Sequence, residues 1–250
     1  MKKEEIILLI LARSGSTRLK NKNLKSIDNK PLIYFKIKSC LAAKIGKTVI
    51  TSNSRKILKY AKKFGCNYFH LRPKIYSTSK ASTISVVLNY LRFLKRNNFN
   101  LPKYIGVFPP TNPFLKSKSI IEAYKKLISN SKFDSIISYT DSTNHLFNFI
   151  NFKKKKIIFN KYAINKKNFS SFERSQDRPK TYISSPALRI TKVGYLLKYL
   201  KNSNPILNKK PFNLTNTIGQ YINEMEALDI NNLFDLKLAR FYFKNKKFLM

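Results

Sequence analysis

Short, continuous apolar runs alternate along the first half of the chain with longer segments in which apolar residues recur every three or four positions. The first run, Glu5–Leu11, is mostly isoleucine and leucine, which is typical of a strand buried on both faces. Similar runs predict strands at residues 47–51, 67–70, 104–108 and 134–140. The longer segments predict helices at residues 31–44, 54–64, 81–94 and 117–129. This alternation predicts an α/β fold with a Rossmann-like, doubly wound and mostly parallel sheet.

The pattern changes after about residue 143. Aromatic residues alternate in Phe147–Phe152 and Lys156–Tyr162, which predicts a hairpin joined by the lysine run between them. A long polar stretch without periodicity follows, up to Arg178 and Pro179, and loops of such length usually act as arms or lids. Beyond it, the pattern predicts a strand at 187–191, a helix at 193–199, an extended segment near 227–230 and a last helix at 233–243.

The 250 residues, 43% of them hydrophobic, are sufficient for one large domain with a buried core. There is no internal repeat and no low-complexity linker, so we expect a single domain over residues 1–250, with residues 143–182 as an excursion from it. Cys40 and Cys66 have no metal-ligand or disulfide spacing, and Cys40 is expected to be a small core residue.

The formal net charge of +38 is compatible with nucleic-acid binding. However, the excess is mostly lysine spread along a chain that is also rich in asparagine, isoleucine and phenylalanine, a profile that an AT-rich coding sequence would give. We therefore expect a solvated basic surface and no specific nucleic-acid partner.

No apolar run approaches the roughly 20 residues that cross a bilayer, so no membrane span is expected. Lys2 and Lys3 precede an apolar run, as in a signal peptide, but acidic residues interrupt the basic region and Arg13 follows the run. The expected location is the cytoplasm.

Small and cationic residues follow the first strand abruptly. Residues 11–24 read Leu-Ala-Arg-Ser-Gly-Ser-Thr-Arg-Leu-Lys-Asn-Lys-Asn-Leu. A buried strand that ends in such a loop offers backbone N–H groups and fixed positive charge, which a triphosphate requires. The glycine spacing is that of neither a Walker loop nor a dinucleotide fingerprint. A solvated basic loop is the alternative on charge alone.

This loop resembles the signature of the acylneuraminate cytidylyltransferases (CMP-sialic acid synthetases) and of the related CMP-Kdo synthetases. Further segments resemble the family's motifs in the same order along nearly the whole chain: residues 29–33, 50–54, 71–73, 81–84, 110–114, 176–179 and 228–231. The resemblance implies a nucleotide-diphospho-sugar transferase fold and transfer of CMP from CTP to a nonulosonic sugar, with release of pyrophosphate and with Mg²⁺ as cofactor.

The resemblance also implies roles for individual residues. Catalytic roles fall on Arg13, Lys22 and Asp229, and the metal would be held by Asp229 and Asn231. The nucleotide would be bound by Arg13, Ser14, Gly15, Lys22, Asn23, Arg72 and Ser82. The sugar would be bound by His145 and Gln176, although a lone histidine more often has a structural role. For Asp229, the alternative is a carboxylate at the start of the last helix.

Several positions depart from the family pattern. Asn231 and Asn53 replace aspartates, Pro109 replaces a common glutamine, and Ser185-Pro186 replaces Asn-Gly. These changes leave two alternatives open: a nucleotidyltransferase of the same superfold with another sugar or base, and a non-catalytic nucleotide-binding relative. In the family, an excursion like residues 143–182 is a dimerisation arm with a small β-hairpin, so the resemblance implies a homodimer. Core packing is the other explanation of its aromatic residues.

Overall fold

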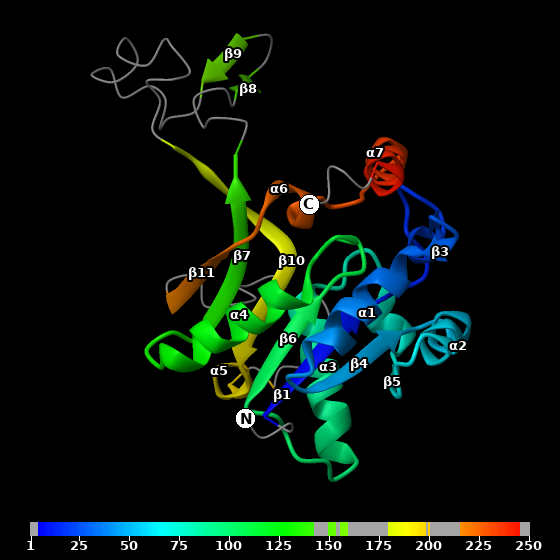
Figure 1. The fold of residues 1–250 in the computed structure, drawn as a ribbon. Helices are drawn as coiled ribbons and strands as arrows, with labels where there is room; N and C mark the ends of the chain where they lie inside the picture. Colours follow the sequence, from blue (N-terminus) through cyan, green and yellow to red (C-terminus); the bar gives the residue numbers. More distant parts are fainter. Residues whose placement is uncertain are drawn as a thin grey trace.

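The computed structural model describes residues 5–142, 150–153, 156–159, 180–198, 200 and 216–245. A seven-stranded sheet has the order β11-β7-β10-β6-β1-β4-β5 (Figure 1). Its strands are β1 (Ile6–Leu11), β4 (Lys47–Ser52), β5 (Tyr68–Leu71), β6 (Tyr104–Phe108), β7 (Ser135–Asp141), β10 (Tyr182–Lys192) and β11 (Thr217–Tyr221). Two small hairpins pair β2 (Ser26–Ile27) with β3 (Lys30–Pro31) and β8 (Ile150–Lys153) with β9 (Lys156–Phe159).

The α-helices are α1 (Leu32–Ala43), α2 (Arg55–Lys63), α3 (Thr83–Arg96), α4 (Ser117–Ser129), α5 (Val193–Leu197), α6 (Glu224–Ala227) and α7 (Leu233–Lys244). Two short 3-10 helices are η1 (Lys22–Leu24) and η2 (Lys74–Ser77). In the part of the chain that the structure covers, no helix combines the length and the apolar character that crossing a membrane takes.

The sheet is mostly parallel, as the sequence predicts. Strand β1 pairs in parallel with β4 and β6, β5 pairs in parallel with β4, and β11 pairs in parallel with β7. Among the described strands of this sheet, only β10 runs antiparallel, between β6 and β7. The strand–helix alternation therefore gave the correct fold class.

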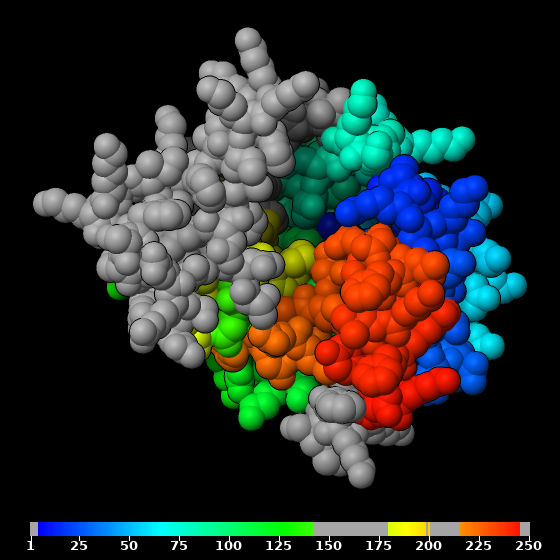
Figure 2. Space-filling view, turned by 90° about the horizontal axis from the view of Figure 1, so that it is seen from above, coloured from blue at the N-terminus to red at the C-terminus, as the bar shows by residue number. Residues whose placement is uncertain are grey.

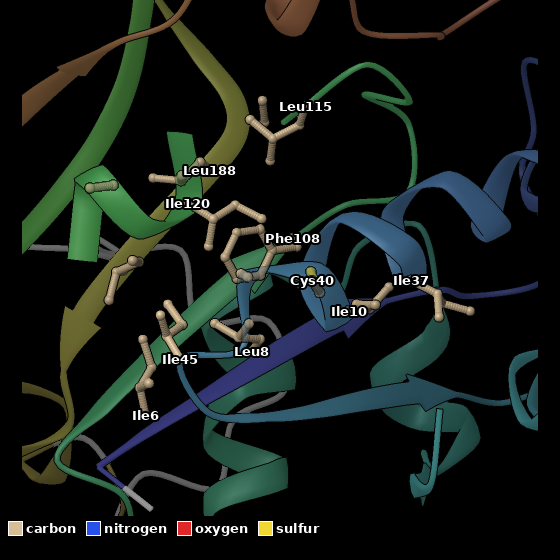
Figure 3. Close-up of a cluster of buried hydrophobic side chains, with 14 of the residues drawn as sticks. Ile6, Leu8, Ile10, Ile37, Cys40, Ile45, Phe108, Leu115, Ile120 and Leu188 are labelled. Atoms are coloured by element: carbon tan, nitrogen blue, oxygen red, sulfur yellow. The ribbon is translucent and has the colours of Figure 1, made fainter. Parts of the chain in front are cut away.

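Helices cover both faces of the sheet. Alternate residues of a strand point to opposite sides, so each strand contributes side chains to both faces. Ile6, Leu8 and Ile10 of β1 point toward α1 and α4 (Figure 3). Ile7 and Leu9 point to the other face and pack with residues of α3 and α5. Cys40 is fully buried in the first of these clusters, which confirms its expected place in the core.

A third, smaller apolar cluster joins the C-terminal helix to the N-terminal part of the chain. Ile27 of β2 and Leu32 of α1 pack with Ile230, Leu236 and Ala239. In the view from above, the orange-to-red C-terminal segment lies against the blue N-terminal segment (Figure 2). This cluster brings residues around 230 to the loop that follows β1.

The second half of the chain differs from the sequence prediction in three places. Strand β10 covers residues 182–192 instead of 187–191, because its polar first half still pairs with β7. A register shift between Ser185 and Arg189 accommodates Pro186, which has no N–H to donate. Strand β11 and helix α6 were not predicted, since one is a short, half-buried edge strand and the other has only four residues.

Within residues 143–182, the predicted hairpin is confirmed in its pairing, with β8 antiparallel to β9. The described strands are Ile150–Lys153 and Lys156–Phe159, and the other residues of the predicted hairpin lie outside the described residues. The two residues expected on the sugar side, His145 and Gln176, lie outside the described residues.

Candidate functional site

The loop after β1 is fixed by hydrogen bonds to the end of the neighbouring strand β4. The Ala12 N–H donates to the carbonyl oxygen of Thr51 at 3.0 Å, and the Ser14 N–H donates to Oδ1 of Asn53 at 2.9 Å. Asn23 closes the loop from its far end, since Nδ2 donates to the carbonyl oxygen of Arg13 at 2.8 Å. The candidate phosphate loop is therefore held by the end of β4 and by its own Asn23. We call residues 12–24 the loop wall.

A glycine and an asparagine make the two sharp bends of the loop wall. Gly15 has φ 82°, in the left-handed region that favours glycine, and its carbonyl oxygen accepts a hydrogen bond from Nη1 of Arg13 at 3.1 Å. Asn21 has φ 54° and leads directly into η1, which carries Lys22 and Asn23. The bends turn this short helix back toward the end of β1.

A cavity of about 250 Å³ lies between the loop wall, the end of β6 and the C-terminal segment. It is located at the carboxyl end of the sheet, where a doubly wound fold binds its ligands. Three cations, Arg13, Arg18 and Lys22, contribute to its lining. The other lining residues are Leu11, Ser16, Thr17, Leu19, Asn23, Pro109, Pro110, Thr111 and Asn231.

Burial and nearby charges shift the pKa of Lys22, which lines this cavity. Partial burial lowers the pKa of its ammonium group, and Asp229 acts in the opposite direction. The positive charges of Arg18 and Arg13 lower the pKa further. These interactions show that the predicted phosphate residues and the predicted metal ligand share one electrostatic environment.

Arg72 follows β5 and is only 4% exposed. Its N–H donates to the carbonyl oxygen of Ser52 at 2.8 Å, while Nε and Nη2 have no hydrogen-bond partner among the described residues. Burial lowers the pKa of this guanidinium to about 10, and Arg13 contributes to the shift. A buried guanidinium with unused donors near Arg13 can bind a polar ligand at low desolvation cost.

The segment before α7 carries the predicted metal ligands. Asn231 Nδ2 donates to Asp229 Oδ2 at 2.7 Å, and Asn231 Oδ1 accepts from Arg18 Nη2 at 3.0 Å. The other Asp229 oxygen, Oδ1, is buried and has no partner within the described part of the chain. We call residues 226–235 the C-terminal wall of the cavity.

Asp229 is not the cap of the last helix, which was the alternative explanation of this residue. The N-cap of α7 is Asn232, whose side chain accepts from the Asp235 N–H at 3.0 Å. Asp235 completes a capping box by accepting from the Asn232 N–H at 3.0 Å. Asp229 therefore remains available for a ligand.

The turn after β6 holds the C-terminal wall in place. The Ile230 N–H donates to the carbonyl oxygen of Thr111 at 2.8 Å. Asn112 is fully buried, and its Nδ2 donates to the carbonyl oxygens of Ala227 and Leu228 at 3.0 and 3.1 Å. Glu226 is also buried and accepts from the Lys116 N–H and from Ser119 Oγ at 2.8 and 2.7 Å.

The predicted site residues do not all meet in this cavity. Ser82 caps α3, because its Oγ accepts from the Ser85 N–H at 3.2 Å, and it does not line the cavity. Gly15, Arg72 and Asp229 are not among the residues that line the cavity either. Ser14 lines a neighbouring space of about 300 Å³ that shares Arg13 and Asn23 with the cavity. A larger space of about 730 Å³ beside α6 contains none of the predicted site residues, so the chemistry favours the smaller cavity.

A profile described as cytidylyltransferase matches residues 7–155, more than half of the chain. The chain belongs to the cytidylyltransferase family. This confirms the family and enzyme class that the motifs predicted. The matched residues include all of β1 but its first residue, the whole loop wall and the turn after β6.

Several curated relatives resemble this cytidylyltransferase. The Campylobacter coli protein described as post-translational flagellin modification protein B is 26% identical, over 97% of this chain and 96% of the relative. The CMP-N,N′-diacetyllegionaminic acid synthase of Campylobacter jejuni is 25% identical, over 95% of this chain and 94% of the relative. The N-acylneuraminate cytidylyltransferase of Escherichia coli is 32% identical over 55% of this chain, which spans only 32% of that relative's length.

A solved structure of CMP:2-keto-3-deoxy-manno-octonic acid synthetase, complexed with CTP, matches with a TM-score of 0.70. The two proteins are 11% identical, and the match covers 97% of this chain and 99% of the other. At such low identity the likeness shows the fold alone. It confirms the expected nucleotidyltransferase fold.

Three polar residues in or near the site of this cytidylyltransferase were given no individual role from the sequence. Arg18 follows small residues in the loop wall, and its positive charge is the feature of the sequence that could have indicated a role. Asn112 lies between Pro110 and Pro113, and these prolines indicate a rigid turn. They do not indicate that Asn112 donates a hydrogen bond to Ala227, which is 115 residues away. Lys36 is a fully buried lysine on α1, and no periodicity argument places a lysine in a core.

Proposed function

We propose that this cytidylyltransferase transfers CMP from CTP to the anomeric hydroxyl of a nonulosonic sugar acid, with release of pyrophosphate. The observation that carries the proposal is the cavity at the end of β1, which Arg13 and Lys22 line and whose Lys22 is under the electrostatic influence of Asp229. Fixed cations beside a carboxylate with a free buried oxygen are suited to a metal-bound triphosphate.

In this reaction the sugar hydroxyl oxygen forms a bond to the α-phosphorus of CTP. The bond from that phosphorus to the bridging oxygen of the β-phosphate breaks, and pyrophosphate leaves with the electron pair. The hydroxyl proton leaves to water. The chain's own task is to align the two reactants and to offset negative charge on the phosphates, which Arg13 and Lys22 can do from a fixed loop.

The donor set fits Mg²⁺ with one protein carboxylate. Asp229 Oδ1 is buried without a partner, and no group of three histidine, cysteine or acidic side chains gathers in the described residues. Mg²⁺ commonly takes one or two carboxylates together with substrate phosphates and water. Asp229 would hold the ion. When bound, Mg²⁺ would offset phosphate charge and make the α-phosphorus more electrophilic.

For the base, we propose that Arg72 and Asn23 border the cytidine side of the cavity, and that Ser82 supports it from the start of α3. The unused donors of Arg72 support this assignment, since a buried guanidinium favours an acceptor-rich partner such as a pyrimidine carbonyl. Pro109 lines the cavity and offers no side-chain hydrogen bond. We expect the base to be recognised by Arg72 and not by the side chain at position 109.

The names of the full-length and partial relatives support a nonulosonic acid as the acceptor. The solved structure with a similar fold is a synthetase for 2-keto-3-deoxy-manno-octonic acid (Kdo), an eight-carbon acid. Kdo is therefore the competing acceptor. The test is a pyrophosphate-release screen of nonulosonic acids and Kdo with each of the four nucleoside triphosphates. Release only with CTP and a nonulosonic acid is expected. Binding of CTP without release for any acceptor would favour the non-catalytic relative.

We further propose a cytoplasmic homodimer, in which residues 143–182 reach the partner and His145 and Gln176 contact the sugar. The long excursion with alternating aromatic residues supports this proposal. Sedimentation at micromolar concentration should give twice 29.2 kDa. A monomer with full activity would contradict a shared site.

A further inference from the structure

A second cavity, of about 430 Å³, lies at the end of the sheet opposite to the catalytic one. It is bordered by the first residues of the parallel strands β1, β4 and β5, whereas the catalytic cavity lies at the other end of β1. In Figure 1 the N-terminus marks this end of the sheet, and α7 lies at the other. None of the residues proposed for the reaction lines this cavity. We call it the aromatic cavity.

Aromatic residues dominate its lining, which includes Tyr68, Phe69, Tyr90, Phe93 and Phe99. The Tyr90 and Phe93 rings are nearly parallel, with centroids 6.2 Å apart, and the Phe93 and Phe99 centroids are 6.5 Å apart. Aromatic rings prefer offset-stacked or edge-to-face contacts with other rings. The lining is therefore suited to a flat, unsaturated ring system.

The outer ring, Phe99, is fixed by the end of helix α3. Asn98 has φ 55°, a left-handed conformation that asparagine tolerates, and its N–H donates to the Lys95 carbonyl oxygen at 3.2 Å. The Phe99 N–H donates to the Leu94 carbonyl oxygen at 3.0 Å, which completes a Schellman motif. This turn places Phe99 beside Phe93 and leaves it 58% exposed. The ring is thus positioned before any ligand arrives.

The polar groups of the aromatic cavity indicate the charge of its ligand. Lys47 is the one charged residue among the twelve that line it, and its Nζ lies 5.8 Å from the centroid of the Tyr68 ring. Asn98 and Asn100 add exposed amide groups that can donate hydrogen bonds. One cation and two amides, with no acidic residue in the lining, complement a ligand with a single negative charge.

His70 of β5 connects the aromatic cavity to the loop wall. Its ring contacts Tyr90 and Phe93, at centroid distances of 5.3 and 4.8 Å. Its Nδ1 shares a hydrogen bond of 2.9 Å with Thr51 Oγ1, and the Thr51 carbonyl oxygen accepts the Ala12 N–H. Mainly through burial, the pKa of His70 is lowered to about 4, so the ring is neutral near pH 7. A shift of Phe93 would reach the anchor of the loop wall through these contacts.

We propose that the aromatic cavity is a second ligand site, which takes a flat aromatic carboxylate, and that His70 links this site to the loop wall. The ring system lies against Phe93 and Phe99, and the carboxylate is directed toward Lys47. A ligand there would act on CTP binding from the far end of the sheet. The site itself is independent of the proposed function, and only its effect on CTP binding rests on that function.

The probe is 1-naphthoate, a flat two-ring carboxylate whose fluorescence can be followed because the chain contains no tryptophan. The ionic strength is kept near 0.15 M, which screens the net charge of +38. Two competing compounds separate the contributions: 1-naphthalenemethanol has the rings without the charge, and cyclohexanecarboxylate has the charge without a flat ring.

Two variants change the aromatic cavity, Lys47→Gln and Phe99→Ala. Their matched controls are Lys95→Gln and Phe241→Ala, which alter an exposed lysine and an exposed phenylalanine that do not line it. The wild type should bind one naphthoate with a dissociation constant of roughly 0.1–1 mM, as expected for a ligand of this size. Each cavity variant should weaken binding about threefold to tenfold, and each control less than twofold. Both competing compounds should bind at least about threefold more weakly than naphthoate.

Equal losses in cavity variants and controls would overturn the site, and so would many weak binding events in place of one. Either result would mean that naphthoate binds only to the general basic surface.

The link through His70 is tested by measuring CTP affinity in EDTA, with and without saturating naphthoate. In the wild type the CTP affinity should change at least about twofold, and CTP should change the naphthoate affinity by the same factor. His70→Phe keeps a ring beside Tyr90 and Phe93 but loses the bond to Thr51. This variant should still bind naphthoate, and its CTP affinity should no longer respond.

No response in the wild type, or a response that persists in His70→Phe, would overturn the link. Thermal melting followed by circular dichroism identifies a variant that has lost its fold. Thr51→Val removes the same hydrogen bond from the other side and replaces His70→Phe in that case. If the wild type does not bind CTP at all, the proposed function fails, whereas the naphthoate titration still decides on the second site.

Discussion

The two walls of the cavity are built in different ways. The loop wall, residues 12–24, is held by bonds to Thr51 and Asn53 and by its own Asn23. The C-terminal wall, residues 226–235, depends on the turn after β6, more than 100 residues earlier in the chain. The first wall carries cations and the second carries the carboxylate. Nucleotide affinity and turnover should therefore respond separately to mutation.

The largest expected effect is on the C-terminal wall. Asp229→Ala removes the proposed metal ligand, so turnover should fall by at least about 1000-fold, equivalent to roughly 4 kcal/mol of transition-state stabilisation. Affinity for CTP in EDTA should stay within a few-fold of the wild type, because the loop wall is intact. Pyrophosphate release and calorimetry measure the two quantities. Wild-type activity and Mg²⁺ dependence in this variant would place the metal elsewhere.

Lys36 of α1 is a fully buried charge that is under the electrostatic influence of Glu226 and Asp229 in the C-terminal wall. Burial lowers its pKa to about 8 from an ordinary 10.5, although Cys40, Glu226 and Asp229 act in the opposite direction. A lysine with a lower pKa in the folded state destabilises the fold below about pH 8, and the penalty fades as the pH rises toward 10.5. The shift corresponds to about 3 kcal/mol at most.

Lys36→Met should therefore raise the free energy of unfolding by about 2–3 kcal/mol at pH 7, with a smaller gain at pH 9.5. Urea unfolding at the two pH values measures both numbers. Lys38→Met, on the exposed side of the same helix, should stay within about 0.5 kcal/mol of the wild type. A gain that does not change with pH would mean that burial of the charge is not its cause.

On the loop wall, Lys22→Ala removes a charge-assisted contact worth about 1.5–3 kcal/mol. Affinity for CTP should fall by roughly 10- to 100-fold, while Lys20→Ala changes it less than twofold. Calorimetry with CTP measures both variants. An unchanged affinity for Lys22→Ala would exclude this loop from the nucleotide site.

A smaller effect should come from a carboxylate at position 231. Asn231→Asp adds a hard oxygen ligand beside Asp229, so the Mg²⁺ concentration that gives half-maximal rate should fall about threefold to tenfold. A Mg²⁺ titration of pyrophosphate release measures this shift. If the half-maximal concentration rises instead, the amide contributes more to the site than a second carboxylate would.

The smallest effect concerns the support of the loop wall. Asn53→Ala removes the acceptor of the Ser14 N–H, which should weaken CTP binding by about fivefold, near 1 kcal/mol for one hydrogen bond. Asn130→Ala removes a partly exposed asparagine outside the site and should leave affinity unchanged. An equal response of both variants would show that the anchor of Ser14 does not set the loop's shape.

The same contrast explains what the sequence could predict. The loop wall follows a buried strand directly, so its place and its cations could be inferred from local pattern and from family resemblance. Asp229 could be named from its motif, but its surroundings could not. The contacts of Asn112 and Glu226 are long-range, and the burial of Lys36 contradicts its chemical type. Strand β11 was missed because edge strands need not alternate clearly.

The distant origin of the C-terminal wall also has a consequence for synthesis on the ribosome. All seven strands of the large sheet are complete once residue 221 has been added, whereas the carboxylate of the site lies at residue 229. A nascent chain released between these points would contain the loop wall and every strand of the sheet. It would lack Asp229 and the α7 residues that pack on Ile27 and Leu32. Prematurely terminated products would therefore carry the cations of the loop wall without the carboxylate that the proposed reaction uses.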